Sequence, residues 1–492
     1  MDWMRIFRSP AALVGVAAMV ATTAPATAET KAAPPAPAPV AVATANPAPA
    51  DLPSEIAALK ARLDLLEQQQ QQQAANAMAD RARQAADRDA AAKRAAQTVP
   101  GNGVHIATPG VDVRLYALLE ATLGAQTNSS GTAATSLGLP VSWFSGNRWG
   151  IDATQRLSST DGPNKLNFIA KLESEYELPS GDMDTPGVLF NRDAWVGIQS
   201  KTFGKLTLGR QNTLPRDVAN IWGDPYIGSA LTLNEGGFTN VNNFKQLIYY
   251  ASGGNGANGQ GDTRYDQGIV YKKLFDNGLF VGVGYNFGDA NGPGGPNGSG
   301  PIPGAQFNRG STAAMGLGYN GRIAHVSAFY NTTNVLDPKQ IGASNAGVQD
   351  QSWGAGGNLD WGRYRVNAGF MYYTGDQGVL GRRYDQAWTV SGKHAPNKYI
   401  DYELGLQEFY AKNAAVNGGG FVLRPFINAL AATATVNGTR FTPYGSVIAH
   451  PAGNLDVYVA ADDLLTGQGY LDARAHGSKH ETEIVMGSRF RF

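Results

Sequence analysis

From about residue 111 onward, hydrophobic and polar residues alternate along short stretches of the chain. In 111–123 every odd position is Val, Leu or Ala, whereas the even positions include Asp112, Arg114 and Glu120. The same alternation returns in 165–176, 363–372, 400–407 and 455–459. A period of two is that of a β-strand with one oily face and one polar face. The repetition predicts an all-β domain over residues 110–492.

The connections between these stretches alternate in length. Short ones lie near 157–164, 200–204, 276–278, 320–321, 361–362, 393–397 and 451–454. Longer ones, rich in Gly, Pro, Ser and Asn, lie near 126–146, 178–188, 212–263, 288–310, 333–351, 374–383, 413–440 and 464–480. Short periplasmic turns and long external loops are typical of transmembrane barrels. The pattern predicts a transmembrane barrel of 16 antiparallel strands, with 18 as the alternative if 245–252 adds a hairpin.

The end of the chain favours closure of the barrel. Hydrocarbon offers no hydrogen-bond partner, so an open sheet edge is too costly and the last strand must pair with the first. Residues 483–492 alternate and end in an aromatic residue, Phe492, a strong signal for outer-membrane assembly. Tyr364, Tyr372 and Phe490 also lie near strand ends and suit the interfacial aromatic girdles.

The first 110 residues follow other patterns. Arg5 and Arg8 precede an apolar run of about 14 residues and then Ala26-Thr27-Ala28, which predicts a signal peptide over 1–28, since a membrane span needs about 20 residues. Residues 29–53 form an Ala/Pro-rich linker, which composition predicts to be extended and semi-rigid.

The segment 54–97 has helical periodicity. Ile56, Leu59, Leu63 and Leu66 fall at the spacing of heptad core positions, which predicts a short coiled coil. Two apolar heptads are marginal alone. They become stable if barrels hold the chains together, which favours a trimeric periplasmic coiled coil. The alternative is a solvated polar tract, given the glutamine run 68–73.

Composition narrows the function classes. There is no cysteine, which excludes disulfides and thiolate chemistry. Lys plus Arg and Asp plus Glu number 40 each, a balance that argues against nucleic acid as a partner. Glycine is abundant, at 61 residues, and the mean hydropathy is −0.26. A barrel explains this low value, because only alternate strand residues face lipid.

Three apparent motifs do not indicate an enzyme, a cofactor or a metal site. Residues 316–321 fit the dinucleotide fingerprint but end in a strand turn with no helix to bind phosphate. Asp182 and Asp184 lack the other ligands of a calcium loop. His325 and Ser327 lie two apart on one strand with no orienting acid, and none of the six histidines has metal spacing.

Short segments along the barrel domain carry a family resemblance. They are 113–116 (VRLY), 147–150 (NRWG), 172–174 (LES), 194–198 (AWVGI), 203–211 (FGKLTLGRQ), 265–271 (YDQGIVY) and 487–492 (GSRFRF). In this order and spacing the chain resembles the trimeric general porins of Gram-negative bacteria. The resemblance implies a homotrimer in contact with outer-membrane lipid and lipopolysaccharide and inserted by the barrel-assembly machinery. It also implies a third external loop, 212–263, folded inward to narrow the pore. The N-terminal extension is more like the subset with periplasmic coiled coils.

Charged residues at the narrow part of such a pore set its selectivity, because low-dielectric walls focus their field. Strand parity points Arg114, Lys171, Arg363 and Arg365 into the lumen. The resemblance adds Arg148, Arg192 and Arg210 to Arg114 and Lys171 as the basic side of the constriction. Arg192 and Arg210 have lipid-side parity, so a bulge or a strand end must place them. The expected acidic side comes from the loop, with Asp217, Asp224 and Glu235.

These observations predict an outer-membrane channel for passive diffusion of small hydrophilic solutes, with the N-terminal extension in the periplasm. The basic cluster favours anions such as small carboxylates. The alternative is a structural protein that ties the outer membrane to peptidoglycan through 54–97.

Overall fold

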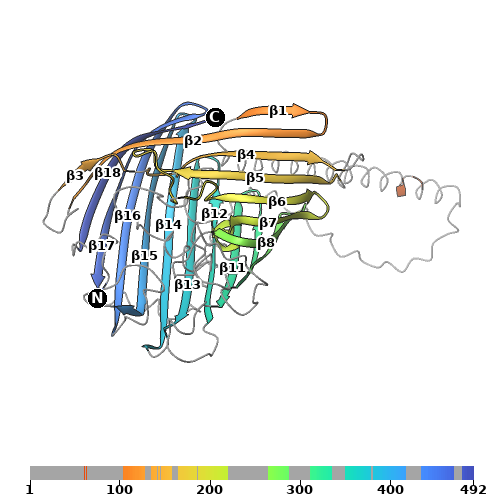
Figure 1. Cartoon of the computed structure of the whole chain (residues 1–492). Coiled ribbons are helices and arrows are strands. Elements are labelled where there is room, and N and C mark those ends of the chain that lie inside the picture. The colour runs from red at the N-terminus through yellow and green to blue at the C-terminus, as the bar shows by residue number, and fades with distance from the viewer. Residues whose placement is uncertain are drawn as a thin grey trace, which may run out of the picture. The chain divides into compact units, whose positions relative to one another are not determined.

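Antiparallel β-strands make up almost all of the described chain (Figure 1). The structure, a computed structural model, describes Lys60, Arg62 and Leu63, which are helical, and most of 103–492. The latter comprises 103–127, 135–140, 142–144, 146–157, 165–185, 187–219, 264–287, 311–334, 349–377, 380–416, 434–469 and 479–492. None of the described helices is long and apolar enough to cross a membrane. The signal peptide, the linker and all but three residues of the expected coiled coil lie outside the described residues.

The elements follow one another in chain order. They are β1 (Val104–Thr108), β2 (Val111–Gln126), β3 (Ser136–Gly138), β4 (Asn147–Arg156), β5 (Asn167–Tyr176), β6 (Asp193–Ser200), β7 (Gly204–Asn212), α3 (Leu214–Ala219), β8 (Arg264–Leu274), β9 (Leu279–Asn286), β10 (Thr312–Asn320), β11 (Ala324–Asn334), β12 (Gln349–Asp360), β13 (Tyr364–Asp376), β14 (Arg382–Asn397), β15 (Ile400–Val416), β16 (Ala434–Ala452), β17 (Leu455–Gln468) and β18 (His480–Arg491).

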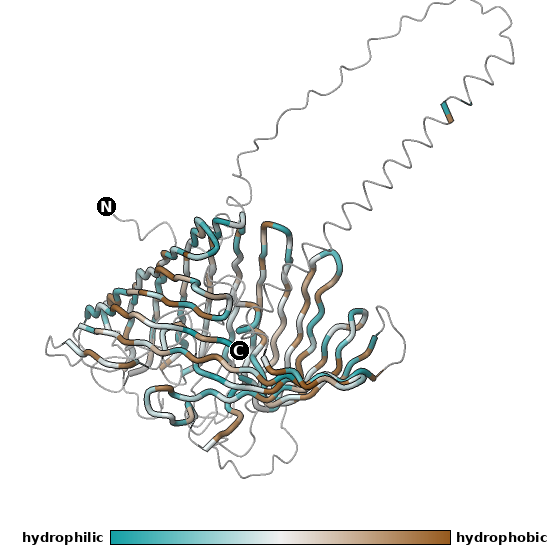
Figure 2. Tube along the Cα trace, turned by 90° about the horizontal axis from the view of Figure 1, so that it is seen from above, coloured by the Kyte–Doolittle hydropathy of each residue, from teal (hydrophilic) through white to brown (hydrophobic). Residues whose placement is uncertain are grey.

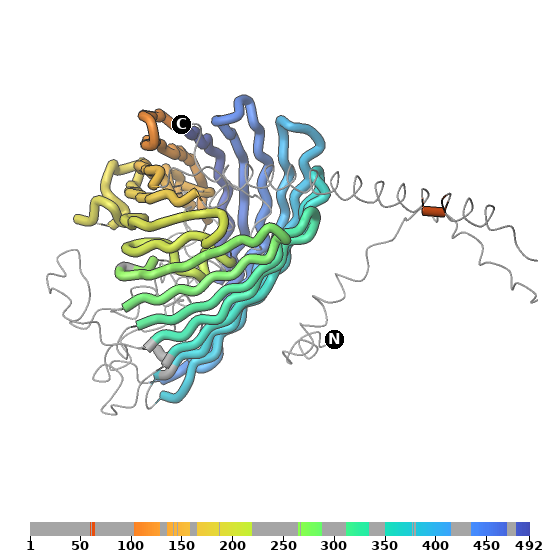
Figure 3. The backbone as a smooth tube through the Cα atoms, turned by 90° about the vertical axis from the view of Figure 1, so that its right-hand side faces the viewer, coloured from red at the N-terminus to blue at the C-terminus, as the bar shows by residue number. Residues whose placement is uncertain are grey.

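The strands form one closed antiparallel barrel. The sheet has 18 strands, of which β1 and β3 pair only with β2, and the other 16 make the ring. Each strand of the ring lies beside its neighbour in the sequence (Figures 1 and 3). Strand β7 pairs directly with β8, so no further strand from 213–263 enters the wall between them. The prediction of a 16-stranded barrel is confirmed.

Pairing of β18 with β2 closes the ring. At the very end of the chain, Phe492 N–H donates to the carbonyl of Ala117 at 3.1 Å, and Ala117 N–H donates back to Phe492 at 3.0 Å. The last residue is therefore part of the seam. This is the arrangement that the terminal strand pattern predicts, since it leaves no open edge in hydrocarbon.

The two faces of the wall differ as the alternation predicts, and hydropathy changes from residue to residue along the strands (Figure 2). On β2, Leu115 and Leu123 point outward and are 41% and 43% exposed, whereas Glu120 and Thr122 point inward and are buried. Large apolar side chains stay exposed on the outer face of most strands. An outer apolar face and a polar lumen are what a bilayer requires.

One expected turn was misplaced. The sequence suggested a turn near 393–397, but β14 continues to Asn397 and the turn is Lys398–Tyr399. The pairing register between β14 and β15 shifts between His394 and Asn397. Pro396 lies in this irregular stretch, where the absence of its N–H costs no ladder hydrogen bond.

Candidate pore constriction

The first residues of the third long loop turn into the barrel and form the short helix α3. Leu214 and Val218 are fully buried against the inner faces of β9 and β10. The wall accommodates them through glycines, since a Cβ at Gly282 would lie 2.7 Å from Leu214 Cδ1 and a Cβ at Gly316 would lie 2.7 Å from Val218 Cγ2. Ser327 Oγ donates to the carbonyl of Val218 at 3.0 Å. Glycines on the wall thus fix the base of the loop inside the lumen.

Asp217, one of the expected loop acids, is locally neutralised on α3. Its carboxylate accepts hydrogen bonds from Lys272 Nζ at 2.6 Å and Asn212 Nδ2 at 2.9 Å. Burial alone would raise the pKa of Asp217, but the Lys272 ammonium and these hydrogen bonds outweigh it and hold the pKa below its usual range. Asp217 is therefore ionised and paired. The other two expected acids, Asp224 and Glu235, lie outside the described residues.

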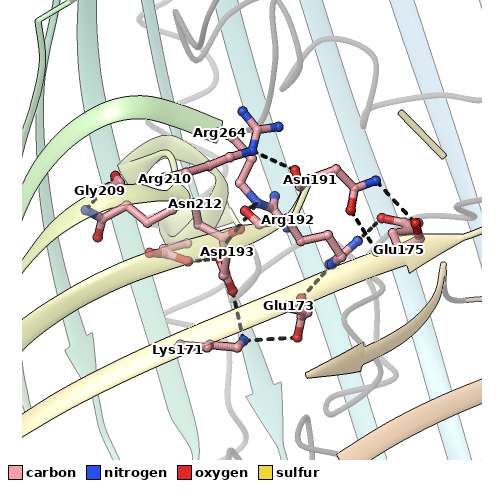
Figure 4. A network of polar contacts seen from close by, with 12 residues as sticks. Lys171, Glu173, Glu175, Asn191, Arg192, Asp193, Gly209, Arg210, Asn212 and Arg264 are labelled. Atoms are coloured by element: carbon pink, nitrogen blue, oxygen red, sulfur yellow. Dashed lines mark hydrogen bonds and ion pairs between the residues drawn. The ribbon is translucent and has the colours of Figure 1, made fainter. Parts of the chain in front are cut away.

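Opposing charges from β5, β6, β7 and β8 lie close together (Figure 4). We call this set the cationic cluster. It comprises Arg148, Lys171, Glu173, Glu175, Arg192, Asp193, Arg210 and Arg264.

Lys171 and Arg192 hold the carboxylates of the cluster together. Lys171 Nζ lies 3.1 Å from Glu173 and 2.8 Å from Asp193. Arg192 Nε lies 2.6 Å from Glu173, and its Nη1 pairs with Glu175. Most of these side chains are buried, but Lys171 keeps 23% of its side chain exposed.

The arginines reach the cluster through irregular backbone. Arg192 lies immediately before β6, and Arg210 lies where the β7–β8 register shifts between Gly209 and Gln211. Gly209 has a φ of +123°, a conformation that favours glycine and allows the bulge. The structure thus uses a strand end for one arginine and a bulge for the other, the two devices that sequence parity required. Arg210 Nε then donates to the carbonyl of Asn191 at 2.7 Å.

Arg264 belongs to this cluster although the sequence analysis did not select it. Its Nε donates to the carbonyl of Arg192 at 2.8 Å and lies 3.7 Å from Asp193. Arg264 is the first residue of β8, and the register shift between Tyr265 and Gly268 separates it from the inward-facing Val270. Parity counted across this shift does not place Arg264, so the alternation of β8 held no signal for it.

Arg114 on β2 and Arg148 on β4 lie on neighbouring strands at the edge of the cationic cluster. Arg148 is buried, donates from Nε to the carbonyl of Gly146 at 3.0 Å, and interacts electrostatically with Glu173. Arg114 pairs instead with Asp152 and lies over the ring of Tyr116, 5.1 Å from its centroid. Arg114 therefore borders the cationic cluster and has its own acid.

The two further lumen candidates on β13 differ. Arg365 is buried on β13 and donates to Asn367 Oδ1 at 3.0 Å. Arg363 lies in the exposed turn one residue before β13 begins at Tyr364, so strand parity does not fix the direction of its side chain.

A second lumen cluster was not foreseen. We call it the anchor cluster; it comprises Glu120, Trp143, Phe144, Ile448, Tyr458 and Val485. Glu120 accepts hydrogen bonds from the backbone N–H groups of Trp143 at 2.8 Å and Phe144 at 2.6 Å, and from Tyr458 Oη at 2.7 Å. The Phe144 and Tyr458 rings meet edge to face at 4.7 Å. Part of the first long loop is therefore also seated on the inner wall.

The motifs set aside in the sequence have other partners. Ser327 is committed to the α3 backbone, and His325 Nδ1 contacts Asn320. Asp184 accepts from Asn191 Nδ2 at 3.3 Å. Beside it, burial and the carboxylates of Asp184 and Glu175 raise the pKa of Glu177, just beyond the end of β5, to about 7. No group of three or more metal-ligating side chains occurs within the described ranges.

A closed 16-stranded barrel with an apolar exterior, a charged lumen and a loop packed against its inner wall defines a porin-type outer-membrane channel fold. A family model described as Gram-negative porin matches residues 74–420, more than half of the chain. The chain belongs to this family of outer-membrane proteins.

Individual relatives are more distant. An outer membrane porin protein of Bordetella pertussis is 30% identical over 142 residues, which is 29% of this chain and 31% of that protein. The match thus spans less than a third of that relative. Among solved structures, the anion-selective porin from Comamonas acidovorans has a TM-score of 0.56 at 15% identity, covering 78% of this chain and all of that one. An outer membrane protein of Vibrio cholerae lacking its loop L8 has a TM-score of 0.51 at 15% identity, with 78% and 100% covered. These likenesses show a shared fold.

Proposed function

We propose that the protein forms a water-filled channel through the outer membrane for passive diffusion of small hydrophilic solutes, and that the channel favours anions such as small carboxylates. The observation that carries the preference is the charge of the cationic cluster. Among the described residues, the cluster holds five cationic side chains, those of Arg148, Lys171, Arg192, Arg210 and Arg264, and three carboxylates, those of Glu173, Glu175 and Asp193. The surplus is positive, and a low-dielectric wall focuses it into the lumen.

The acids that balance the cluster come from the strands. Glu173, Glu175 and Asp193 form ion pairs within the wall, so neighbouring cations neutralise their charge. Asp217 on α3 is likewise paired with Lys272. The described residues on this side of the lumen therefore carry net positive charge. The similar Comamonas porin is described as anion-selective, but at 15% identity that likeness supports the fold, and the preference rests on the cluster.

The same proposal includes a homotrimer, which the family suggests, with the N-terminal extension in the periplasm and no catalytic activity. Lipopolysaccharide and the barrel-assembly machinery stay expected partners. The alternative role as a tether to peptidoglycan depends on 54–97, of which the structure describes Lys60, Arg62 and Leu63 alone. No contact among the described residues favours it.

Solute flux tests the function directly. The purified chain is reconstituted into liposomes, and swelling is followed with solutes matched in size. We expect small mono- and dicarboxylates to enter faster than neutral sugars, and sugars faster than amines. Absence of flux for every solute would contradict the channel, whereas equal flux of carboxylates and amines would contradict only the preference.

A further inference from the structure

Five consecutive hairpin turns at one end of the barrel share a chemistry. Each has a lysine or arginine within two residues of a large apolar side chain. They are Lys201 and Phe203 between β6 and β7, Lys273 near the end of β8 with Phe275 just after it, Arg322 and Ile323 between β10 and β11, Trp361 and Arg363 between β12 and β13, and Lys398 and Tyr399 between β14 and β15. We call this set the turn belt. Because neighbouring strands pair in order, the five turns follow one another along the rim (Figure 3).

The belt is exposed. Phe203, Trp361 and Tyr399 are 67%, 53% and 56% exposed, values that are high for aromatic residues. Lys398 Nζ lies 4.9 Å from the centre of the Tyr399 ring, and Lys273 Nζ lies 4.5 Å from the centre of the Phe275 ring. In both turns the lysine ammonium therefore lies beside an aromatic ring.

The belt's charges are largely uncommitted within the described part of the chain. Arg322, Arg363 and Lys398 form no ion pair there. Lys201 lies 3.4 Å from Asp276, but 69% of the lysine side chain and 75% of the aspartate side chain are exposed, so water screens this pair. Lys273 Nζ donates to the carbonyl of Thr202, whereas the other four cations are available to an external anion.

A row of outward-facing tyrosines lies just above the belt. It comprises Tyr271, Tyr319, Tyr364 and Tyr402, on β8, β10, β13 and β15. The last three are about half exposed, and Tyr364 stacks on His394 with ring centres 4.6 Å apart. Tyrosine in such a row marks the depth where hydrocarbon meets headgroups. The turn cations beyond it then lie at the depth of lipid phosphates.

The pattern is a property of one arc of the barrel. The turn between β1 and β2 is Pro109–Gly110, and that between β16 and β17 is Gly453–Asn454, and neither carries a cation or an aromatic residue. A need for short or polar connections would apply equally to every turn at this end of the barrel. Lys165 and Leu166, described between β4 and β5, also fit the pattern. The cations on the arc from β4 to β15 therefore require a separate cause.

We propose that the turn belt binds the headgroups of anionic glycerophospholipids in the periplasmic leaflet, with the aromatic side chains at the acyl boundary and the lysines and arginines on the phosphates. The proposal rests on the outer-membrane placement above, since short turns lie on the periplasmic side. Opposite charge and matching depth favour a lipid over a soluble anion. A basic residue near a membrane surface attracts anionic lipid by an amount that corresponds to about a fivefold preference.

Spin-label spectroscopy tests the belt. The full chain is refolded into phosphatidylcholine vesicles containing a trace of spin-labelled phosphatidylglycerol or spin-labelled phosphatidylcholine, and the protein-bound fraction of each is measured. We expect a preference for phosphatidylglycerol of about fivefold at low salt, falling towards onefold near 1 M salt. The variant with Lys201→Gln, Arg322→Gln, Arg363→Gln and Lys398→Gln should lose it. A control that replaces two exposed lysines at the other end of the strands, Lys412→Gln and Lys479→Gln, should keep the preference.

The outcomes separate the belt from the channel. Equal association of the two lipids with the unmodified chain would overturn the proposal, as would a preference that survives in the four-residue variant. Binding of the unmodified chain to isolated peptidoglycan, lost in that variant and without any lipid preference, would overturn it too and assign the belt to the cell wall. Conductance of the same vesicle preparations reports on the channel independently, and heat-modifiable migration on gels shows that each variant is folded.

Discussion

The anchor cluster and the cationic cluster both place charged side chains on the inner wall of the barrel. The first buries its charge, and the second leaves part of its charge exposed. In the anchor cluster, Glu120 is fully buried, and its Oε1 accepts hydrogen bonds from two backbone N–H groups and from Tyr458. In the cationic cluster, cationic side chains outnumber carboxylates among the described residues, and Lys171 remains partly exposed. The difference is the apolar cover, since Trp143 and Phe144 seal the first cluster and no such pair covers the second among the described residues. An inward-facing charged side chain covered by apolar residues anchors a loop to the wall. Without such cover, its charge acts on solutes in the pore.

Removing the aromatic cover should have the largest effect on this contrast. Replacing Trp143 and Phe144 with alanine removes two buried rings, each worth about 3–5 kcal/mol. We expect the loop segment to leave the wall and single-channel conductance to rise, measured in planar bilayers. Leu139→Ala, an exposed residue of the same loop, is the control and should leave conductance unchanged. Unaltered conductance in the double variant would mean that the segment does not narrow the pore.

Glu120→Ala removes the acceptor and should have a smaller effect. It leaves two backbone N–H groups and Tyr458 without this partner, and loss of a buried charged partner typically costs about 3–5 kcal/mol in all. We expect a lower temperature for the heat-induced gel shift of the folded barrel. Glu120→Gln keeps an acceptor oxygen and should retain most of the stability. Equal shifts in the two variants would show that charge, and not the hydrogen bonds, fixes the segment.

The smallest effect concerns pH near the external end of the cationic cluster. The pKa of Glu177 is about 7 in the folded chain, above its ordinary value of 4.5, because of burial and its acidic neighbours. Protonation therefore stabilises the turn, fully below about pH 4.5, and this contribution is lost as pH rises through 7. Amide hydrogen exchange in 177–185, corrected for intrinsic rates, should quicken between pH 5.5 and 8.

Glu177→Gln is the control for this pH dependence. The glutamine side chain is neutral at every pH, so the exchange rates should become independent of pH over the same range. A slope that persists in Glu177→Gln would assign the titration to another group.

The sequence predicted the barrel wall better than the segments that lie inside the lumen. Alternation predicted the strand faces, the closed ring and the seam at Phe492, because each follows from a local period of two and from the need to pair every backbone group. It did not predict α3 or the seat of Trp143. Both depend on contacts with distant strands, such as Gly316 for α3 and Tyr458 for the first loop, and no local pattern encodes them.

The cationic cluster lay between these cases. Arg148 and Lys171 followed from resemblance and parity, and Arg192 and Arg210 needed a strand end and a bulge that a single sequence does not locate. The acids were sought in the loop, but Glu173 and Asp193 on the strands hold the cluster together. Arg363 lies one residue outside β13, where parity no longer fixes the direction of a side chain.

The reversal potential in a salt gradient tests the central claim most directly. The unmodified channel should be anion-selective, most clearly at low ionic strength. Replacing Arg192, Arg210 and Arg264 with glutamine leaves Lys171 and Arg148 against three carboxylates, so the reversal potential should move to the cation side. The control with Arg322, Arg363 and Lys398 replaced removes as many charges outside the lumen and should shift it far less. A cation-selective unmodified channel, or equal shifts in the two variants, would contradict the account.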